Sequence, residues 1–334
     1  MSDLKEILVN KKNCKSIWFM RQAGRYLPEF RKIRLQNKDF IKLCLDSELS
    51  SEITLQPIKR FNIDSAIIFS DILMVPYALG QKVEFVRNMG PKLNELNFKL
   101  LTKENAKSFK QKLQPVYEAI RITRDKLNKE KSLIGFVGAP WTLLVYMLDL
   151  KLNKNELDYR KIKSRRNDIS LILGKLNKYL SLHIENQINA GADVIQIFDS
   201  WAGLIKSEDF INYCIKPNSK LVNFCKKKNI PVICFPRGIG ESYKKFNDVV
   251  RPDGLNIDYE ISPGWAKANL KNVVIQGGLD PKILLNTEKV MISNAKKYID
   301  TFQDLPYVFN LGHGLLPSTD PDKVEKLIKF YRNY

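Results

Sequence analysis

Residues 167–198 read NDISLILGKLNKYLSLHIENQINAGADVIQIF, and this stretch combines the two patterns that decide the fold. Its first part carries apolar residues at helical spacing and ends at Gly191, a residue type that commonly terminates helices. A compact apolar and β-branched run, VIQIF at 194–198, follows and is typical of a strand buried on both faces. We therefore predict a helix that leads directly into a buried strand.

The same kind of apolar run recurs along the chain, and longer segments of helical periodicity separate the runs. Segment 47–61 opens with a Ser–Glu capping signal, and segments 207–228 and 320–334 also have the pattern of helices. Eight runs are predicted as strands, at residues 16–20, 65–69, 133–137, 194–198, 231–235, 254–257, 273–276 and 307–311.

Eight buried strands that alternate with helices predict an α/β fold: a single-domain (β/α)8 TIM barrel over residues 1–334, with its active site at the C-terminal ends of the strands. The long interval between the second and third runs predicts an insertion within residues 72–131. A doubly wound sheet is the alternative, and it would carry a Gly-rich phosphate loop after an early strand. Neither G-x-G-x-x-G nor G-x-x-x-x-G-K-[ST] occurs in the sequence, so we favour the barrel.

The composition is ordinary for a globular protein of 334 residues, with 44% hydrophobic and 27% charged residues. The five cysteines are widely spaced and include no C-x-x-C pair, which argues against a disulfide framework or a structural zinc site and favours a reducing compartment. The first residues lack the apolar core of a signal peptide, and the longest apolar stretch, 66–80, is interrupted by Asp71 and Pro76. We expect a cytoplasmic protein that does not associate with membranes.

The formal net charge of +19 allows two interpretations. A basic nucleic-acid-binding protein would show a clustered basic stripe with aromatic residues, whereas the lysines here are dispersed among Asn and Ile. Compositional bias also produces dispersed lysines, and it is the favoured explanation of the charge. The excess charge would also attract a polyanionic substrate.

Arginine is concentrated in SIWFMRQAGRYLPEFRKIR, residues 16–34, although lysine dominates the rest of the chain. This stretch holds four of the 14 arginines and only one of the 41 lysines. A planar guanidinium binds a carboxylate or phosphate through two parallel hydrogen bonds, which an ammonium group cannot do. The stretch is therefore either an anion-binding segment or a solvated basic loop.

Polar and small residues follow each predicted strand, where a barrel carries its chemistry. They are Arg21, Ser70-Asp71, Gly138-Ala139-Pro140-Trp141, Asp199-Ser200-Trp201, Pro236-Arg237-Gly238, Asp258, Gly277-Gly278-Leu279-Asp280 and Gly312-His313-Gly314. We expect these residues to converge at the C-terminal face of the barrel.

Several of these residues also have purely structural interpretations. Asp71 would serve equally well as a helix cap or as a catalytic group, and a cap is favoured for Ser200. Asp280 before a proline indicates a helix start, and Asp258 stays undecided. His313 lies between two glycines, which favours a role in the site.

The remaining histidine, His183, lies in an amphipathic helical segment and is predicted to be structural. A zinc site fits poorly because no cysteine is close to His313 in sequence. A Ser-His-Asp hydrolase fits poorly because no G-x-S-x-G motif is present. The residues instead indicate a site for a large polyanion, with several arginines, a carboxylate and no cofactor motif.

The chain resembles the uroporphyrinogen decarboxylase family along nearly its whole length. The motifs that carry the resemblance occur in family order: RQAGRYLPEFR (21–31), TLQPIKRF (54–61), AIIFSDIL (66–73), GFVGAPWTL (135–143), FDSWAG (198–203), GGLDP (277–281) and NLGHGL (310–315). The resemblance implies a (β/α)8 barrel, usually homodimeric, with neither metal nor organic cofactor. It also implies removal of CO2 from four acetate side chains of uroporphyrinogen III, which gives coproporphyrinogen III in haem and related tetrapyrrole synthesis.

The resemblance further implies that Asp71, Arg21 and His313 take part in catalysis, with Asp71 meeting the pyrrole N–H groups at the centre of the macrocycle. The substrate contacts that it implies are Arg21, Gln22, Ala23, Gly24, Arg25, Arg34, Asp71, Tyr146, Ser200 and His313. A substrate with eight carboxylates would account for the arginines. The proton donor stays open among Arg21, His313 and a bound water.

Two segments depart from the family pattern. Gly278 stands where Asn is expected, so we expect one polar contact near the seventh strand to be missing, and GLNIDYEIS (254–262) is an unusual sixth-strand segment. Two alternative functions are retained: a corrinoid- or thiol-dependent methyltransferase on the same barrel, and a non-enzymatic basic nucleic-acid-binding protein. The methyltransferases resemble zinc enzymes with His and Cys ligands and lack the RQAGR stretch.

Overall fold

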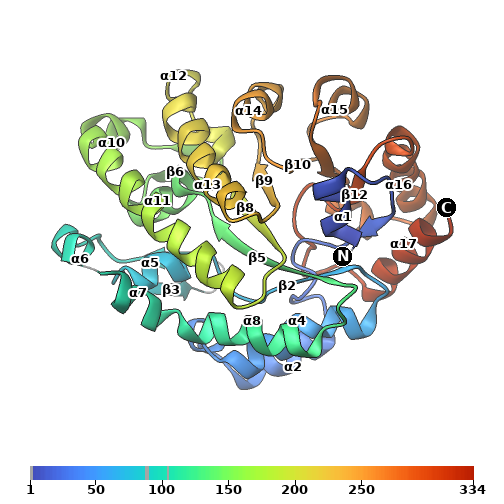
Figure 1. The fold of residues 1–334 in the computed structure, drawn as a ribbon, viewed down its shortest axis with the longest axis horizontal. Coiled ribbons are helices and arrows are strands. Elements are labelled where there is room, and N and C mark those ends of the chain that lie inside the picture. Colours follow the sequence, from blue (N-terminus) through green and yellow to red (C-terminus); the bar gives the residue numbers. More distant parts are fainter. Residues whose placement is uncertain (1–2, 87–89, 104) are drawn as a thin grey trace.

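A computed structural model describes residues 3–86, 90–103 and 105–334 (Figure 1). Eight parallel strands form one sheet in the order β1-β12-β11-β10-β9-β8-β5-β2. From β2 to β12, strands that are neighbours in the sheet are consecutive among these eight along the chain, and β1 lies beside β12. This arrangement confirms the predicted (β/α)8 barrel. The strands are β1 (Ser16–Ile17), β2 (Ser65–Ile67), β5 (Ser132–Gly138), β8 (Val194–Asp199), β9 (Val232–Pro236), β10 (Gly254–Ile257), β11 (Val274–Gly277) and β12 (Tyr307–Phe309).

The barrel closes between β1 and β2 through a side chain as well as the backbone. The Asp64 N–H donates to the Ile17 carbonyl at 2.9 Å, and Asp64 Oδ2 accepts from the Ile17 N–H at 2.7 Å. The buried Gln22 amide adds a bond from Nε2 to the Ser65 carbonyl at 2.9 Å. These bonds bring the segment after β1 beside the segment after β2.

Helices pack around the strands, and all of them except α1, which packs against the interior cluster, lie outside the barrel (Figure 1). They are α1 (Asp3–Asn10), α2 (Pro28–Gln36), α3 (Phe40–Cys44), α4 (Ser47–Arg60), α5 (Met74–Ala78), α6 (Phe98–Lys103), α7 (Ala106–Lys112), α8 (Gln114–Lys126), α9 (Pro140–Met147), α10 (Tyr159–Ser164), α11 (Arg166–Asn189), α12 (Ser207–Phe210), α13 (Lys216–Lys227), α14 (Ser242–Val250), α15 (Pro263–Asn269), α16 (Glu288–Phe302) and α17 (Pro321–Asn333).

Two helix predictions need correction. The cap of α4 is Asp46, whose carboxylate accepts from the Leu49 N–H at 2.9 Å, and not the Ser–Glu pair that follows it. The segment 207–228 is not one continuous α-helix, because a π-helical stretch at Ile211–Ile215 separates α12 from α13. The end at Gly191 is as predicted, since this glycine follows α11 with a φ of 112°.

Apolar side chains fill the inside of the barrel. Ile134, Val194, Ile233, Val274 and Val308 form one buried cluster, to which α1 contributes Leu4, Ile7 and Leu8. A polar layer joins Trp18, Gln196, Asn256 and Gln276, with Gln276 Nε2 donating to Asn256 Oδ1 at 2.8 Å. The interior is thus packed, and groups that meet a ligand must lie at an end of the barrel.

Two antiparallel hairpins extend the barrel. One joins β3 (Val83–Val86) to β4 (Gly90–Leu93) within the interval 72–131, and the other joins β6 (Lys151–Asn153) to β7 (Glu156–Leu157) after α9. The interval 72–131 also holds α5, α6, α7 and α8. Among the described helices, none has both the length and the apolar character that a membrane span requires.

Candidate active site

Arg21 lies just beyond β1, in a loop that the β12 segment holds in place. The N–H of Met20 donates to Asn310 Oδ1 at 3.1 Å, and the Met20 carbonyl accepts from the Leu315 N–H at 2.9 Å. Arg21 itself has a φ of 60°, a left-handed conformation that is uncommon for arginine. The Arg21 side chain lies across Gly314, where a Cβ would come within 2.4 Å of Arg21 Cδ. The structure thus places Arg21 next to the loop of His313.

Asp71 lies beyond β2, the strand on the other side of the β1–β2 junction. Its Oδ1 accepts a hydrogen bond from the Leu73 N–H at 2.9 Å. Burial raises the pKa of Asp71 to about 6, although the bond from Leu73 and the nearby Arg21 charge both act to lower it. The carboxylate is therefore ionised at neutral pH, although its desolvation makes the ionised form less stable than it would be in water.

Six groups from four loops and helix α9 lie within electrostatic reach of one another at the C-terminal face, and we call them the Arg21 cluster: Arg21, Arg25, Asp71, Tyr146, Arg237 and His313. Burial lowers the pKa of the Arg21 guanidinium, Asp71 and Tyr146 act to raise it, and Arg25 and Arg237 act to lower it further. Arg21 is nonetheless solvent-exposed, so protein surrounds it while one side stays open to water. Positive charge exceeds negative charge in this cluster.

The opposite charges in the cluster do not neutralise each other directly. Within the described residues, Arg21 forms no salt bridge with Asp71, that is, no nitrogen–oxygen pair within 4.0 Å. The two groups still shift each other's pKa, so they face the same space. Such an arrangement suits a ligand that presents N–H groups to Asp71 and carboxylates to the arginines.

His313 is half-buried between the buried Gly312 and Gly314. Burial and the charges of Arg21 and Arg237 lower its pKa to about 4. The imidazole is therefore neutral at pH 7 in the empty site and can donate or accept a hydrogen bond.

Tyr146 comes from α9 and belongs to an aromatic wall of the cluster. Its ring meets that of Trp201 edge-on, with centroids 6.0 Å apart, and the Lys151 ammonium lies 4.7 Å and 4.8 Å from the two ring centroids. Burial raises the pKa of Tyr146, so its hydroxyl is a neutral donor at pH 7. Lys151 lies in β6, and desolvation lowers its pKa.

The other residues predicted to contact substrate differ in exposure. Gln22 is fully buried, and both its side chain and its backbone take part in structural hydrogen bonds, so it exposes no atom at the surface of the site. Ala23, Gly24 and Ser200 are half-buried. Arg34, also half-buried, lies in α2 with its guanidinium 5.4 Å from the centre of the Phe40 ring.

Three other carboxylates that follow strands, including the undecided Asp258, have structural partners. Asp258 accepts from the Gly238 N–H at 2.7 Å and from the Tyr243 hydroxyl at 3.1 Å. Asp199 is buried and accepts from Thr142 at 2.7 Å and from Asn218 at 3.0 Å. Asp280 caps a 3₁₀ helix at Pro281–Leu285 as predicted, accepting from the Lys282 N–H.

Ser200 does not have the capping role that the sequence favoured. The short 3₁₀ helix at Ala202–Leu204 begins after Trp201, and no side chain caps it. Ser200 instead directly follows β8, at the C-terminal face of the barrel.

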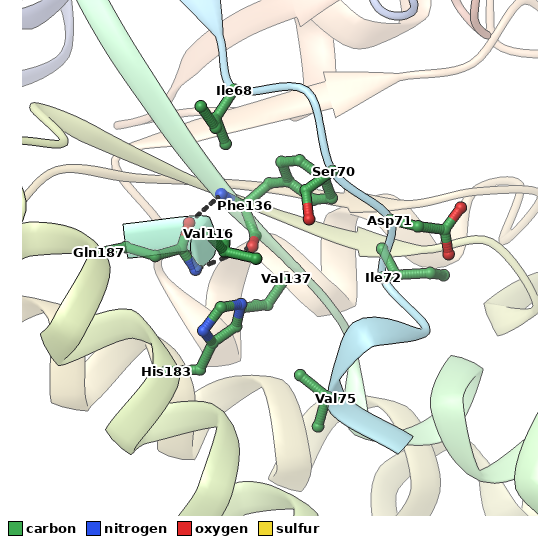
Figure 2. Close-up of a pocket in the computed structure, with 10 residues that line it drawn as sticks. All are labelled: Ile68, Ser70, Asp71, Ile72, Val75, Val116, Phe136, Val137, His183 and Gln187. Carbon is green, nitrogen blue, oxygen red and sulfur yellow. Dashed lines mark hydrogen bonds between the residues drawn. The ribbon is translucent and has the colours of Figure 1, made fainter. Parts of the chain in front are cut away.

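A small hollow lies behind Asp71, between the barrel and α11. Figure 2 shows Ser70, His183 and Gln187 around it, with the Asp71 carboxylate directed away from His183. The hollow admits no water-sized sphere, so it is not a substrate site. His183 bonds to the Tyr117 hydroxyl at 3.0 Å, and burial lowers its pKa to about 3, which confirms its predicted structural role.

Gly278, which replaces the expected Asn, is explained by crowding. Its φ is +107°, and a Cβ there would lie 2.3 Å from Tyr298 Cε1. The Tyr298 hydroxyl also donates to the Gly278 carbonyl at 2.7 Å. The tyrosine ring therefore occupies the space next to this backbone.

Sequence reasoning did not single out Arg237 and Lys151 as candidate site residues. From the sequence, Arg237 is predicted only as one of the residues that follow strands. The signal that could have singled it out is the use of arginine at such a position in a chain that otherwise favours lysine. Lys151 gave no signal, because its place beside Tyr146 depends on how the β6–β7 hairpin folds back. Among the described residues, no three His, Cys, Asp or Glu side chains come together as a metal site.

Comparisons with known proteins agree with this geometry. The family model described as Uroporphyrinogen decarboxylase (URO-D) matches residues 11–334. The chain is 44% identical over 331 residues to the uroporphyrinogen decarboxylase of Orientia tsutsugamushi (strain Ikeda), covering 97% of this chain and 96% of that protein. It is 42% identical over 324 residues to that of Rickettsia bellii (strain RML369-C), covering 95% and 94%.

Among solved structures, a methyltransferase from Methanosarcina mazei superposes with a TM-score of 0.75 at 16% identity, covering 99% of this chain and 97% of that one. A B12-independent methionine synthase from Shewanella sp. W3-18-1 gives a TM-score of 0.56 at 10% identity, over 86% of each chain. At such identities the likeness describes the fold alone. The sequence matches are much closer and extend over nearly the whole chain, and they show that the chain belongs to the uroporphyrinogen decarboxylase family.

Proposed function

We propose that this protein is a uroporphyrinogen decarboxylase that converts the four acetate side chains of uroporphyrinogen III to methyl groups and releases four molecules of CO2. The relatives that span nearly the whole chain support this function. The observation in the structure that carries it is the charge arrangement of the Arg21 cluster, in which Asp71 stands without a salt bridge among arginines.

The chemistry requires a place for the electrons of the breaking bond. Protonation of the pyrrole ring carbon next to the acetate makes the ring cationic. The C–CO2 bond then breaks, its electron pair flows into the ring, and CO2 leaves an exocyclic methylene group. A proton adds to this methylene carbon to make the methyl group, and loss of the first proton from the ring carbon restores the aromatic pyrrole. The substrate thus serves as its own electron sink, and we propose that no metal or organic cofactor takes part.

Asp71 would stabilise this reaction through its fixed charge. Its backbone is held beside β2 and its carboxylate is already partly desolvated, so it needs little reorganisation when positive charge develops on the ring. Arg21, Arg25 and Arg34 would hold substrate carboxylates, with Tyr146 and Ser200 as further contacts. His313 would take part as a neutral hydrogen-bonding group, because its pKa of about 4 disfavours imidazolium at pH 7. Because bound substrate carboxylates would raise the pKa of His313, the proton donor stays open among Arg21, His313 and a bound water.

The decisive experiment is anaerobic incubation with uroporphyrinogen III, followed by chromatography of the oxidised porphyrins. We expect intermediates with seven, six and five carboxylates and a final product with four. Extensive dialysis against a strong chelator should leave this activity intact. A loss of activity restored by zinc would instead favour the methyltransferase alternative.

We further infer a homodimer in the cytoplasm that binds neither nucleic acid nor membranes, and here the family resemblance is the support. Analytical ultracentrifugation across a concentration series tests the dimer. An electrophoretic shift assay with duplex DNA and with RNA, at physiological salt, tests the nucleic-acid alternative.

A further inference from the structure

Arg237 lies on the far side of the barrel from Arg21, Arg25 and Arg34, the three arginines that the resemblance implies as substrate contacts. In the strand order, β9 is separated from β1 by β12, β11 and β10 in one direction and by β8, β5 and β2 in the other. These two strands are therefore diametrically opposed in the closed barrel. Arg237 follows β9 directly, whereas Arg21 follows β1.

The alternation of β9 directs Arg237 toward the barrel axis. Ile233 and Phe235 both belong to the cluster that fills the barrel interior, and Arg237 is the next residue in this period of two. Arg237 acts electrostatically on both Arg21 and His313, which lie in the loops after β1 and β12. The side chain thus reaches the space that the Arg21 cluster shares.

The backbone of Arg237 is fixed from both sides. Its N–H donates to the Asp199 carbonyl at 3.1 Å, and its carbonyl accepts from the Gly203 N–H at 2.9 Å. The next residue, Gly238, donates to Asp258 Oδ2 at 2.7 Å. The loops pack so closely that a Cβ on Gly203 would lie 2.3 Å from the Gly238 carbonyl oxygen. The backbone from which the Arg237 side chain extends is therefore held in a fixed position.

The Arg237 guanidinium has no acidic partner in the protein. It is half-buried, and within the described residues it forms neither a salt bridge nor a side-chain hydrogen bond. Asp258, the carboxylate bonded to the following residue, is occupied by Gly238 and Tyr243. The guanidinium donors of Arg237 are therefore available to a ligand that carries a carboxylate.

We propose that Arg237 is a substrate-binding residue that holds a carboxylate of the tetrapyrrole on the side of the macrocycle opposite the Arg21–Arg34 segment. This inference rests on the proposed function. Uroporphyrinogen carries carboxylates around its entire edge, so cations from one side of the barrel would leave the other side without partners. Arg237 supplies the opposite contact, and a bidentate guanidinium also fixes how far the macrocycle can rotate.

The test compares Arg237→Gln and Arg237→Lys with the matched control Arg160→Gln, which removes the same charge from an exposed position in α10. We expect KM for uroporphyrinogen III to rise about 10- to 100-fold in Arg237→Gln, the range of a lost charge-assisted hydrogen bond. The rise in Arg237→Lys should be smaller, and Arg160→Gln should match the wild type. An unchanged KM in Arg237→Gln overturns the proposal, as does an equal rise in Arg160→Gln.

A second readout is independent of activity. The chain has only two histidines, so ¹⁵N-histidine labelling gives two imidazole titrations. The groups that face His313 are Arg21, Arg237 and the Gly314 backbone, so its pKa should rise in Arg237→Gln and stay unchanged in Arg160→Gln. The His183 signal should not move, which verifies the fold of each variant.

The two levels of the proposal fail in different ways. If the wild type does not decarboxylate uroporphyrinogen, the proposed function is wrong whatever the variants do. If the wild type is active but the His313 titration is unmoved in Arg237→Gln, Arg237 does not reach the cluster and only the further inference is wrong.

Discussion

Asp71 accepts a hydrogen bond from the Leu73 N–H at 2.9 Å through Oδ1, and the same carboxylate faces Arg21. A local structural role and a site role therefore coexist, because the bond to Leu73 uses one oxygen. No hydrogen bond to Asp71 Oδ2 is present within the described chain. The local bond fixes the side chain, and the charge remains available to a ligand.

Replacing Asp71 with Asn separates these two roles. The amide oxygen of Asp71→Asn can still accept from Leu73, but the negative charge is lost. We expect single-turnover decarboxylation to slow by about a hundredfold or more, roughly 3 kcal/mol, as for other preorganised electrostatic groups. Substrate affinity should change less, because the charge acts mainly on the cationic ring. All four decarboxylations should slow alike.

Thermal unfolding provides the control for Asp71→Asn. The midpoint at pH 8 should be unchanged or higher, since a desolvated carboxylate destabilises the empty enzyme. Asp320→Asn is a matched variant, because exposed Asp320 also accepts from the N–H two residues on, at 3.0 Å, at the start of α17. Near-wild-type turnover would remove Asp71 from the mechanism, and lost activity with a collapsed midpoint would favour a purely structural role.

The pH dependence should reflect the raised pKa of Asp71. Because this pKa is about 6 and the ionised form is required, the single-turnover rate of wild type should fall as pH drops through 6. For stability the sign is opposite: a raised carboxyl pKa penalises the folded state above pH 6, and the penalty disappears as pH falls toward 3.8. Asp71→Asn should therefore gain stability at pH 8 but not at pH 4.

Buried Asp199 also has a pKa raised to about 6, so the fall in rate at low pH must be assigned to one of the two carboxyl groups. The assignment comes from the residual decarboxylation rate of Asp71→Asn, measured from pH 5 to pH 8. If the fall in wild-type rate at low pH is due to protonation of Asp71, the rate of the variant should not fall over this range. A fall that persists in the variant assigns the titration elsewhere, and Asp199 is then the first group to examine.

The barrel could be predicted from sequence because its evidence is local. Each buried strand is a short apolar run, and helices such as α11 end at glycines, so periodicity alone gives the order of elements. The π-helical stretch at Ile211–Ile215 could not be predicted, because local sequence gives no signal for one extra residue in a helical turn.

Most of the candidate site was predictable from the family motifs, and the family resemblance also supplied Tyr146, which lies just beyond one of them. Arg21 and Asp71 lie in motifs, and the structure brings them together. The role of Asp258 was undecidable from sequence, because its partners lie 20 and 15 residues away, Gly238 in the loop after β9 and Tyr243 in α14. A position directly after a strand indicates that a residue lies at the C-terminal face of the barrel, but it does not indicate which residue will be its hydrogen-bond partner.

Arg25 should bind through the geometry of its guanidinium as well as through its charge. Arg25→Lys keeps the charge and loses the planar pair of donors, so we expect KM to rise by a factor that corresponds to about 1–3 kcal/mol. Salt should raise the wild-type KM more steeply than it lowers kcat, because long-range attraction is screened. Unchanged KM and kcat in Arg25→Lys would show that Arg25 is a surface residue without a role in binding.

The absence of Asn at position 278 should reflect a steric limit and not a loss of function. Gly278 has a φ of +107°, and a Cβ would lie 2.3 Å from the Tyr298 ring, so even Gly278→Ala must displace the ring or the backbone. We expect it to destabilise the fold by about 2 kcal/mol or more, a fall of several degrees in the thermal midpoint. Gly174→Ala in α11 is the matched control, because no atom lies within 4 Å of its added Cβ. That variant should instead gain up to about 1 kcal/mol from helix propensity. A wild-type midpoint in Gly278→Ala would mean that the Tyr298 ring yields freely, and crowding would then not explain why this chain lacks the asparagine.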